Sequence, residues 1–415
     1  MHFFTYKRSK FYAEGVSIEK IAKEVGTPCY IYSHKTLIRH YTAFDEAFKS
    51  VPHLICYSVK ANSNIAVLNT FVKQGSGVDI VSGGELYRAL KAGADPKKIV
   101  YSGVGKKEDE IEYALKTGIL MFNVESPEEL RTINKIAGRL KKKAGFAIRV
   151  NPNVDPKTHP YISTGLKKNK FGIETEQAIQ EYVYAKNNLK NLTPIGVDCH
   201  IGSQITQLSP FVDALKKTKE IINTLRRQGI AVKYLDIGGG LGITYKDEDA
   251  PHPSKYGKVV IDETRGLGVI FIFEPGRVMV GNAGILVTKV LYTKQGTAKK
   301  FIIVDAAMND LARPSLYGSY HVIKSFKKND SEKEIIADVV GPICESGDFF
   351  AKDRELPEFK SGDLMAIMSG GAYGFSMSSN YNSRPRVSEV MVKGNKFKII
   401  RQRETYKDLI KGENI

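Results

Sequence analysis

Between Leu54 and Glu274 the chain alternates short apolar runs with stretches that carry helix signals. Short apolar runs are typical of buried strands. Eight occur, each ending at or just before a residue able to carry chemistry or turn the chain: Leu54–Tyr57 before Lys60, Val78 before Asp79, Ile99–Tyr101 before Ser102, Ile119–Phe122 before Asn123, Phe146–Ile148 before Arg149, Ile195–Val197 before His200, Tyr234–Ile237 before Gly238 to Gly240, and Val269–Phe273 before Glu274. The alternation predicts an α/β fold, a (β/α)8 TIM barrel.

The length agrees with this fold. Leu54 and Glu274 are 274 − 54 = 220 positions apart, near the roughly 250 residues of such barrels. All strands of a TIM barrel open their C-terminal ends onto one face. The residues that follow the eight runs therefore form a candidate active site.

Helix starts support the alternation. Ser82 and Ser126 each precede a glutamate by three residues, the spacing of a capping box, so we expect structural roles for them. Ser209-Pro210 begins a longer helix that Gly229 can end.

After Glu274 the pattern changes to strand-like alternation without intervening helices, which predicts a second, mostly antiparallel β domain. The segments are Ile285–Tyr292, Phe301–Val304, Ile335–Val340, Leu364–Met368 and Val387–Val392. We expect the barrel at residues 30–278 and the β domain at residues 279–415, joined by residues 1–29. A strand-like segment at Cys29–Tyr32 could belong to either domain.

Composition narrows the function. Lys and Arg (62) exceed Asp and Glu (45), a net charge of +17, but the lysines are scattered along helices, as at Arg139–Lys143 and Lys216–Lys219. No aromatic-interleaved basic tract occurs, so we expect solvated helix faces and an anionic small substrate rather than nucleic acid. The four widely spaced cysteines predict neither a metal site nor a disulfide framework. No signal peptide or membrane span is evident, and we expect a cytoplasmic protein.

Lys60 lies just beyond an apolar strand, in Tyr57-Ser-Val-Lys-Ala-Asn62. A barrel mouth can desolvate its ammonium and lower its pKa, and a lysine so tuned can form a Schiff base with a carbonyl. Alone, this pattern also fits a surface lysine at the end of a strand.

Gly238-Gly-Gly-Leu-Gly242 follows the seventh strand, and glycines let backbone N–H groups approach a phosphate. Ile243 stands where a dinucleotide fingerprint needs its last glycine, and no Gly-Lys-Ser/Thr follows. Phosphate sites after the late strands are common in this barrel.

Glu274-Pro-Gly-Arg277 closes the last strand. A carboxylate beside a pyridine nitrogen favours its protonated form and strengthens the ring as an electron sink. His200 could stack on that ring and Ser203 could donate to a phosphate, although a lone histidine at a strand end is more often a core residue. Together these features fit pyridoxal 5'-phosphate (PLP) better than any other common cofactor.

Three loop motifs lie in the β domain: Arg313-Pro-Ser-Leu-Tyr317, Cys344-Glu345 and Gly371-Ala-Tyr373-Gly. Each alone fits packing or surface roles as well as ligand binding.

The chain resembles the fold-type III PLP-dependent decarboxylases, most closely the branch that acts on meso-2,6-diaminopimelate. The resemblance runs nearly end to end through these motifs and Gly77-Val-Asp-Ile-Val-Ser-Gly-Gly-Glu85, His200-Ile-Gly-Ser-Gln204 and Cys344-Glu-Ser-Gly-Asp348. It implies an alanine racemase-like architecture, a homodimer with active sites at the interface, and formation of L-lysine and CO2 in the last step of lysine biosynthesis.

The resemblance also implies residue roles. Lys60 holds PLP, His200 stacks on its ring, and Glu274 pairs with the ring nitrogen. The phosphate is bound by Gly240 and its neighbours, including Gly239, with Ser203 and Tyr373, and the cofactor site also includes Gly276 and Arg277. The distal end of the substrate is bound by Arg277, Arg313, Tyr317, Glu345 and Tyr373, and the partner subunit supplies Cys344 and Glu345. Asp79 matches a family acid near the lysine, and its role stays open.

The implied substrate has physical support. Its far end carries both a carboxylate and an ammonium, which suit Arg277, Arg313 and Glu345. Ornithine's far end is only an ammonium, which an arginine would repel. The alternatives are related decarboxylases acting on carboxynorspermidine, ornithine or arginine. A racemase is disfavoured because Glu274 strengthens the electron sink, and a non-catalytic PLP-binding protein would leave the β domain unexplained.

In the implied reaction the substrate amine displaces Lys60, CO2 leaves from the D-centre, and Cα is protonated. We favour Cys344 as the proton donor, with Lys60 as the competitor.

Overall fold

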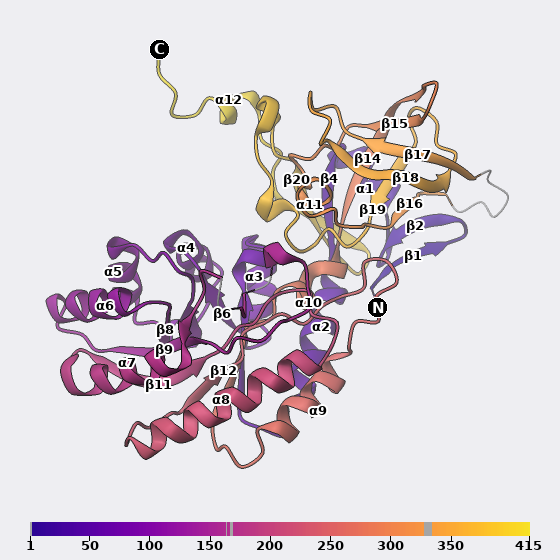
Figure 1. The fold of residues 1–415 in the computed structure, drawn as a ribbon. Coiled ribbons are helices and arrows are strands. Elements are labelled where there is room, and N and C mark those ends of the chain that lie inside the picture. The colour runs from indigo at the N-terminus through magenta and orange to yellow at the C-terminus, as the bar shows by residue number, and fades with distance from the viewer. Residues whose placement is uncertain (1, 163, 167–168, 328–333) are drawn as a thin grey trace. The chain divides into compact units, whose positions relative to one another are not determined.

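The computed structural model describes residues 2–162, 164–166, 169–327 and 334–415 (Figure 1). The chain divides into two compact units. The first, called the barrel unit below, comprises residues 40–243 and 249–278. The second, called the β unit, comprises residues 1–39, 244–248 and 279–415.

Eight parallel strands close the barrel, in the order β9, β11, β12, β13, β5, β6, β7, β8 and back to β9. Their bounds are β5 His53–Ser58, β6 Gly77–Ile80, β7 Ile99–Tyr101, β8 Met121–Val124, β9 Ala144–Asn151, β11 Leu192–Asp198, β12 Tyr234–Asp236 and β13 Ile270–Phe273. A two-residue strand, β10 Ile173–Glu174, also pairs with β9. Each apolar run overlaps one barrel strand, so the predicted TIM barrel is confirmed.

Helices follow the strands and surround the barrel (Figure 1). They are α2 His34–Glu46, α3 Ile65–Val72, α4 Gly83–Lys91, α5 Glu108–Thr117, α6 Pro127–Arg139, α7 Thr175–Asn188, α8 Ser209–Arg227 and α9 Pro253–Glu263, with short 3-10 turns η1 Val59–Ala61, η2 Pro96–Lys98 and η3 Pro160–Ile162. Inside the barrel one side chain from each of five strands packs into a common apolar cluster: Cys56, Val100, Met121, Ala147 and Ile272.

The predicted serine caps are present, with one difference. Ser82 Oγ accepts the N–H of Glu85, and Ser126 Oγ accepts the N–H of Glu129, each at 3.2 Å. The glutamate carboxylates, however, reach the residue before each serine: Glu85 accepts from Val81 and Glu129 from Glu125. The glutamates therefore fix the strand-to-helix turns as well as the helix ends.

The β unit contains two sheets. Its strands are β1 Phe4–Lys7, β2 Lys10–Ala13, β3 Val16–Ser17, β4 Cys29–Ser33, β14 Gly284–Gln295, β15 Lys300–Val304, β16 Ile323–Ser325, β17 Glu334–Val340, β18 Phe349–Pro357, β19 Leu364–Ile367, β20 Ser388–Lys393 and β21 Lys396–Arg401. Its other elements are α1 Ile18–Val25, α11 Arg313–Tyr317, α12 Tyr406–Leu409, η4 Gly281–Ala283, η5 Phe375–Met377 and η6 Tyr381–Ser383, and α10 Arg277–Val280 enters it from the barrel unit. Most pairings are antiparallel, and the β15–β17 and β4–β20 pairs are parallel. The second, mostly antiparallel β domain is confirmed.

The segment Cys29–Tyr32, which the sequence could not assign, lies in β4. This strand runs between β14 and β20 in the larger sheet and is fully buried. Its Ile31 packs in the same core as Ile285, Val287 and Val390. Both edges of β4 are hydrogen-bonded, to β14 and to β20, so its backbone groups are satisfied within this sheet. Residues 30–39 accordingly belong to the β unit.

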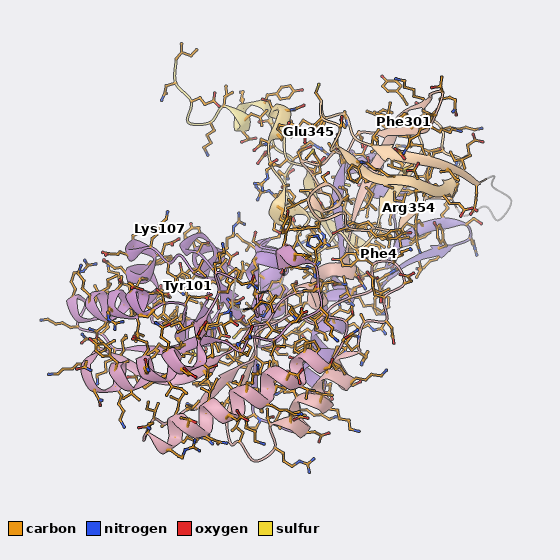
Figure 2. All side chains as sticks on the ribbon, in the orientation of Figure 1. Phe4, Tyr101, Lys107, Phe301, Glu345 and Arg354 are labelled. Atoms are coloured by element: carbon orange, nitrogen blue, oxygen red, sulfur yellow. The ribbon has the colours of Figure 1, made fainter. Side chains whose placement is uncertain are left out.

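The lysine-rich stretches Arg139–Lys143 and Lys216–Lys219 lie on or at the ends of α6 and α8, and most of their side chains are exposed. Figure 2 shows such long side chains projecting outward from the helices of the barrel unit. No helix within the described residues is both long and apolar enough to cross a bilayer.

One lysine of the barrel unit is buried instead. The Lys106 side chain is 0% exposed and its Nζ lies 2.6 Å from Glu129 Oε1. The same ammonium donates to the carbonyl oxygens of Gly103 and Asn123. Lys106 thus ties the start of α6 to the C-terminal end of β8.

We expect Lys106→Met to lower the free energy of unfolding by about 3–5 kcal/mol, because it leaves the Glu129 carboxylate buried without its cation. Urea unfolding followed by circular dichroism measures this. The double variant Lys106→Met/Glu129→Gln is expected to recover most of the loss, because a neutral amide oxygen can still accept the Glu125 N–H. The exposed neighbour serves as a control in Lys107→Met. An equal loss in Lys107→Met would contradict the assignment.

Candidate active site

Lys60 lies in η1, immediately after β5, at the C-terminal end of the barrel. Its Nζ is 2.8 Å from Asp79 Oδ2, and its side chain is 36% exposed while that of Asp79 is fully buried at the end of β6. Ser58 Oγ donates to the same Asp79 oxygen at 2.8 Å and to the carbonyl of Glu274 at 2.9 Å. The ammonium is thus held at an opening by a buried anion, where a carbonyl compound could still reach it.

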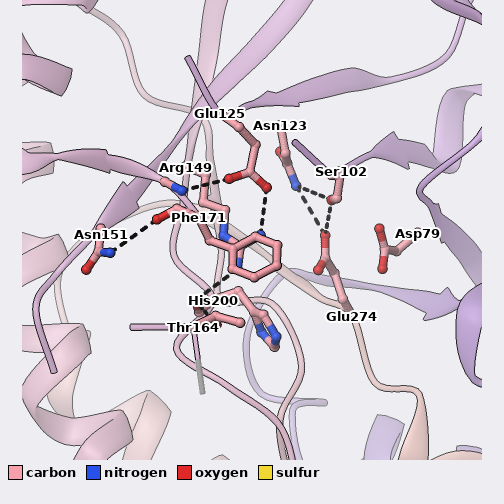
Figure 3. Close-up of polar contacts among 12 residues, drawn as sticks. Asp79, Ser102, Asn123, Glu125, Arg149, Asn151, Thr164, Phe171, His200 and Glu274 are labelled. Carbon is pink, nitrogen blue, oxygen red and sulfur yellow. Dashed lines mark hydrogen bonds and ion pairs between the residues drawn. The ribbon is translucent and has the colours of Figure 1, made fainter. Parts of the chain in front are cut away.

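Glu274 follows β13 and is 5% exposed. Its Oε1 accepts from Ser102 Oγ at 3.0 Å and from Asn123 Nδ2 at 3.1 Å (Figure 3). Asn123 Nδ2 also lies 3.1 Å from Ser102 Oγ. Ser102 and Asn123, whose roles the sequence left open, therefore orient the Glu274 carboxylate.

Burial, and after it the negative charge of Asp79, raise the pKa of Glu274 to about 7 against the opposing effect of Lys60 and Arg149. A cation placed beside this carboxylate would restore its ionised form. The site is therefore suited to a partner that brings a positive charge.

His200 lies on the loop after β11, where backbone contacts fix it. Its carbonyl accepts from Arg149 Nη2 at 3.2 Å and from Thr164 Oγ1 at 3.0 Å, and its Nδ1 accepts the N–H of Gly239 at 3.2 Å (Figure 3). Burial, with the positive charges of Arg149 and Lys60, lowers the pKa of His200 well below its usual value. The ring is therefore neutral at physiological pH, as a stacking group should be.

Arg149 is held by a buried ion pair. Its Nη1 lies 2.7 Å from Glu125 Oε1, and the second oxygen of Glu125 accepts the N–H of Gly172 at 2.7 Å (Figure 3). Asn151 Nδ2 donates to the carbonyls of Leu166 and Phe171. Glu125 thus fixes both the arginine and the segment that follows β9.

The glycine loop after β12 leaves no space for side chains. A Cβ on Gly238 would lie 2.7 Å from His200 Nδ1, one on Gly239 would collide with the Glu274 carbonyl, and one on Gly240 with the Gly202 carbonyl. Gly238 and Gly240 also have positive φ angles of 69° and 109°. The loop therefore excludes side chains, so a phosphate could approach its backbone closely.

Ser203 and Arg277 contact each other. Arg277 Nη2 donates to Ser203 Oγ at 3.2 Å, and Arg277 is 6% exposed. A buried guanidinium beside a serine hydroxyl suits an anion. Gly276 packs closely on η1, where its Cβ would lie 3.0 Å from that of Ala61.

The barrel unit thus brings together nine of the expected residues: Lys60, Asp79, His200, Ser203, Gly239, Gly240, Glu274, Gly276 and Arg277. An amine, an anion cradle and a buried carboxylate fit the aldehyde, phosphate and ring nitrogen of PLP.

The remaining expected residues lie in the β unit. Arg313, at the start of α11, is 5% exposed and donates to Tyr245 Oη at 2.8 Å and to Ser319 Oγ at 3.0 Å. Its guanidinium also lies over the Tyr245 ring, 4.6 Å from the centroid. Tyr317 ends the same helix and is partly exposed, as is Tyr373, which has a positive φ of 54°.

Cys344 and Glu345 are both exposed on the loop between β17 and β18. The Cys344 N–H donates to Asn382 Oδ1 at 3.1 Å, and Glu345 Oε2 accepts from Tyr381 Oη at 2.7 Å. Asp348 fixes the loop by accepting the N–H groups of Met308 and Ile343, both at 2.7 Å. The thiol and carboxylate are therefore presented on an ordered loop.

No role was predicted for Glu125, Asp236 or Tyr245. Asp236 Oδ2 accepts from Asn123 Nδ2 at 3.0 Å, so it belongs to the group around Glu274. Its position just before the glycine loop could have indicated that it lies near the site. Glu125 and Tyr245 had no such signal, because their partners are distant in sequence.

A family model described as the pyridoxal binding domain of pyridoxal-dependent decarboxylases matches residues 34–281. Over 411 residues the chain is 52% identical to the diaminopimelate decarboxylase of Vibrio cholerae, covering 99% of this chain and 98% of the relative.

Solved structures show similarity to the same family. The structure of diaminopimelate decarboxylase from Helicobacter pylori complexed with L-lysine has a TM-score of 0.92 and 45% identity, covering 95% of this chain and 98% of that one. The enzyme from M. jannaschii in co-complex with L-lysine has a TM-score of 0.94 and 38% identity, covering 99% and 98% of the two chains.

The raised pKa of Glu274 predicts a dependence of stability on pH. Between pH 4.5 and about 7 the folded chain keeps a proton that the unfolded chain has released, so the free energy of unfolding should fall as pH rises through this window. We expect Glu274→Gln to flatten this slope by up to about 1 kcal/mol per pH unit. Urea unfolding at a series of pH values measures it, on protein stripped of PLP because a pyridinium would lower the pKa again.

Glu220→Gln, which changes an exposed carboxylate on α8, is the control and should keep the wild-type slope. A Glu274→Gln slope identical to wild type would show that Glu274 is ionised throughout.

Proposed function

Because the chain belongs to the pyridoxal-dependent decarboxylases, and within them to the diaminopimelate decarboxylases, we propose that it decarboxylates meso-2,6-diaminopimelate at its D-centre to L-lysine and CO2. The observation that supports this most directly is the grouping of Lys60, the glycine loop and Glu274 around one end of the barrel. The chain is thus an enzyme and its cofactor is PLP. When bound, PLP accepts the electrons of the broken Cα–carboxylate bond.

Lys60 supplies the amine that holds the cofactor. Its ion pair with Asp79, at 2.8 Å, fixes Nζ at the mouth before attachment. Glu274, oriented by Ser102 and Asn123, would pair with the ring nitrogen, and the neutral His200 ring would stack on the cofactor. Asp79 would hold Lys60 in place, as its ion pair does here.

The phosphate is bound where side chains are excluded. Gly239, Gly240 and Gly276 line the proposed phosphate site, with Ser203 Oγ and the Arg277 guanidinium, which already contact each other. Tyr373 supplies a further hydroxyl.

Arg313 binds the distal carboxylate of the substrate. Tyr245 and Ser319 accept two of its N–H groups and hold the guanidinium plane in one orientation. Arg277 and Tyr317 complete this grip, and Glu345 pairs with the distal ammonium. A substrate with an ammonium alone would place a second cation beside the buried Arg313 guanidinium, and two like charges repel.

The enzyme acts as a homodimer with shared active sites. Cys344 and Glu345 are exposed on an ordered loop, as expected for groups that a subunit presents to its partner. Cys344 protonates Cα after CO2 leaves, and Lys60 Nζ is the alternative donor. The four cysteines are free, which suits the reducing cytoplasm that we propose as its location.

We expect CO2 release from meso-diaminopimelate and much slower release from ornithine, arginine or carboxynorspermidine. Arg313→Met should lower kcat/KM for meso-diaminopimelate about 100-fold, the loss of a charge-assisted hydrogen-bond pair. Tyr245→Phe should lower it about tenfold, mainly through KM, since the guanidinium remains but is less well oriented.

A preference of the wild-type enzyme for a substrate without a distal carboxylate would overturn the assignment of substrate and of Arg313 together. Ser361→Ala, at a surface serine that bonds only the Leu291 carbonyl, is the control.

If each active site takes Lys60 from one subunit and Cys344 from the other, two inactive variants should complement each other. Lys60→Ala and Cys344→Ala should each be nearly inactive as homodimers. After mixing, with subunit exchange, a heterodimer has one site with both Lys60 and Cys344 intact, so activity should return. Steady-state CO2 release before and after mixing measures this, and sedimentation establishes the dimer. If mixing restores nothing while the subunits demonstrably exchange, both residues serve a site within one chain.

A further inference from the structure

Four carboxyl groups are buried at the C-terminal end of the barrel. They belong to Asp79, Asp198, Asp236 and Glu274, at or beyond the ends of β6, β11, β12 and β13, and none is more than 5% exposed. The cations that face this group are Lys60, which contacts Asp79, and Arg149, which pairs with Glu125. Four ionised carboxylates cannot be stable here, because too few cations oppose them.

Asp236 and Glu274 are the most tightly linked of the four. Asn123 Nδ2 lies 3.0 Å from Asp236 Oδ2 and 3.1 Å from Glu274 Oε1, so one amide bridges both carboxyls. A hydrogen bond with Asp236 is among the influences that lower the pKa of Glu274. Two anions held by one amide would repel each other, which favours a proton on one of the two carboxyls.

The surrounding charges favour Asp236 as the carrier of that proton. Glu274 is influenced by Asp79, by the carboxyl of Asp236, and by the positive charges of Lys60 and Arg149. The strongest charged influences on Asp236 are the carboxyls of Glu274 and Asp198, and its hydrogen-bond partners include the neutral Asn123 amide and the Gly238 N–H, at 2.9 Å. The negative charge is therefore more stable on Glu274.

We propose that Asp236 keeps a proton in the working enzyme and donates it in a hydrogen bond to Glu274, while Asn123 clamps both carboxyls, so that one negative charge faces the cofactor ring. Asp236 and Asn123 are positioning residues for Glu274. Burial, which raises the pKa of Asp236 well above its usual value, supports the protonated form. The role of Glu274 opposite the ring rests on the proposed function, whereas the location of the proton does not.

The clamp is itself anchored. The Asn123 carbonyl accepts from the buried Lys106 ammonium at 2.7 Å, and Lys106 pairs with Glu129. The bridging amide is therefore attached to a backbone position that a buried ion pair holds. Asn123 can fix the distance between the two carboxyls because it cannot move freely itself.

Infrared spectroscopy of the full-length holoenzyme at neutral pH tests the proposal, because a protonated carboxyl has a carbonyl stretch distinct from that of a carboxylate. Other buried acids contribute bands, so the measured quantity is the difference between wild type and each variant. Asp236→Asn should remove one protonated-carboxyl band, whereas Glu274→Gln should leave that band in place. Asp247→Asn, at an 80% exposed side chain, is the control and should change nothing in this region.

The reverse pattern, a band lost in Glu274→Gln and kept in Asp236→Asn, would place the proton on Glu274 and overturn the proposal. So would the absence of any difference band for Asp236→Asn. If that variant does not fold, Asp236→Glu, which keeps the carboxyl but moves it, should shift the band, and an unshifted band would overturn the proposal. Asn123→Ala should lower kcat about tenfold with little change in KM, since it loosens only the clamp. The infrared result needs no substrate, so it can fail while the proposed reaction stands, or hold while the reaction fails.

Discussion

The structure depends most on the cost of keeping charge away from water at one end of the barrel. Lys60, Arg149, Asp79, Glu125 and Glu274 are all withdrawn from solvent there, fully or in part. Each charge is stable only because an opposite charge or a fixed donor lies within hydrogen-bonding distance. This requirement explains why so many polar side chains of the barrel point at one another, and why they bind each other in fixed positions before any small molecule arrives.

Preorganisation follows from the same constraint. A carboxylate that Ser102 and Asn123 already hold does not need to reorient when a cofactor binds, and neither does a histidine whose carbonyl and ring are both bonded. Preoriented dipoles stabilise charge at little further cost. The glycine loop contributes in the opposite way, since it leaves room that any side chain would fill.

The sequence predicted the barrel well because its strands are buried on both faces and read as apolar runs. It missed β18 and β21, whose segments Phe349–Pro357 and Lys396–Arg401 mix charged and exposed residues with apolar ones. Lys60, His200 and Glu274 could be found because strand ends converge in this fold. The Asn123–Asp236 contact could not, because 113 positions separate the two residues and only the closed barrel brings them together. Tyr245 was missed for a similar reason, since nothing in its surroundings points to Arg313, 68 positions away.

The path of the chain has a consequence for how such an enzyme can change. Residues 244–248, including Tyr245, belong to the β unit, although the residues on both sides belong to the barrel unit. Neither unit is one continuous stretch of sequence, so a gene segment encoding one cannot be exchanged without cutting the other. Recombination with another barrel would separate Tyr245 from Arg313. Altered substrate preference in this lineage should therefore accumulate by point substitution rather than by shuffling of modules.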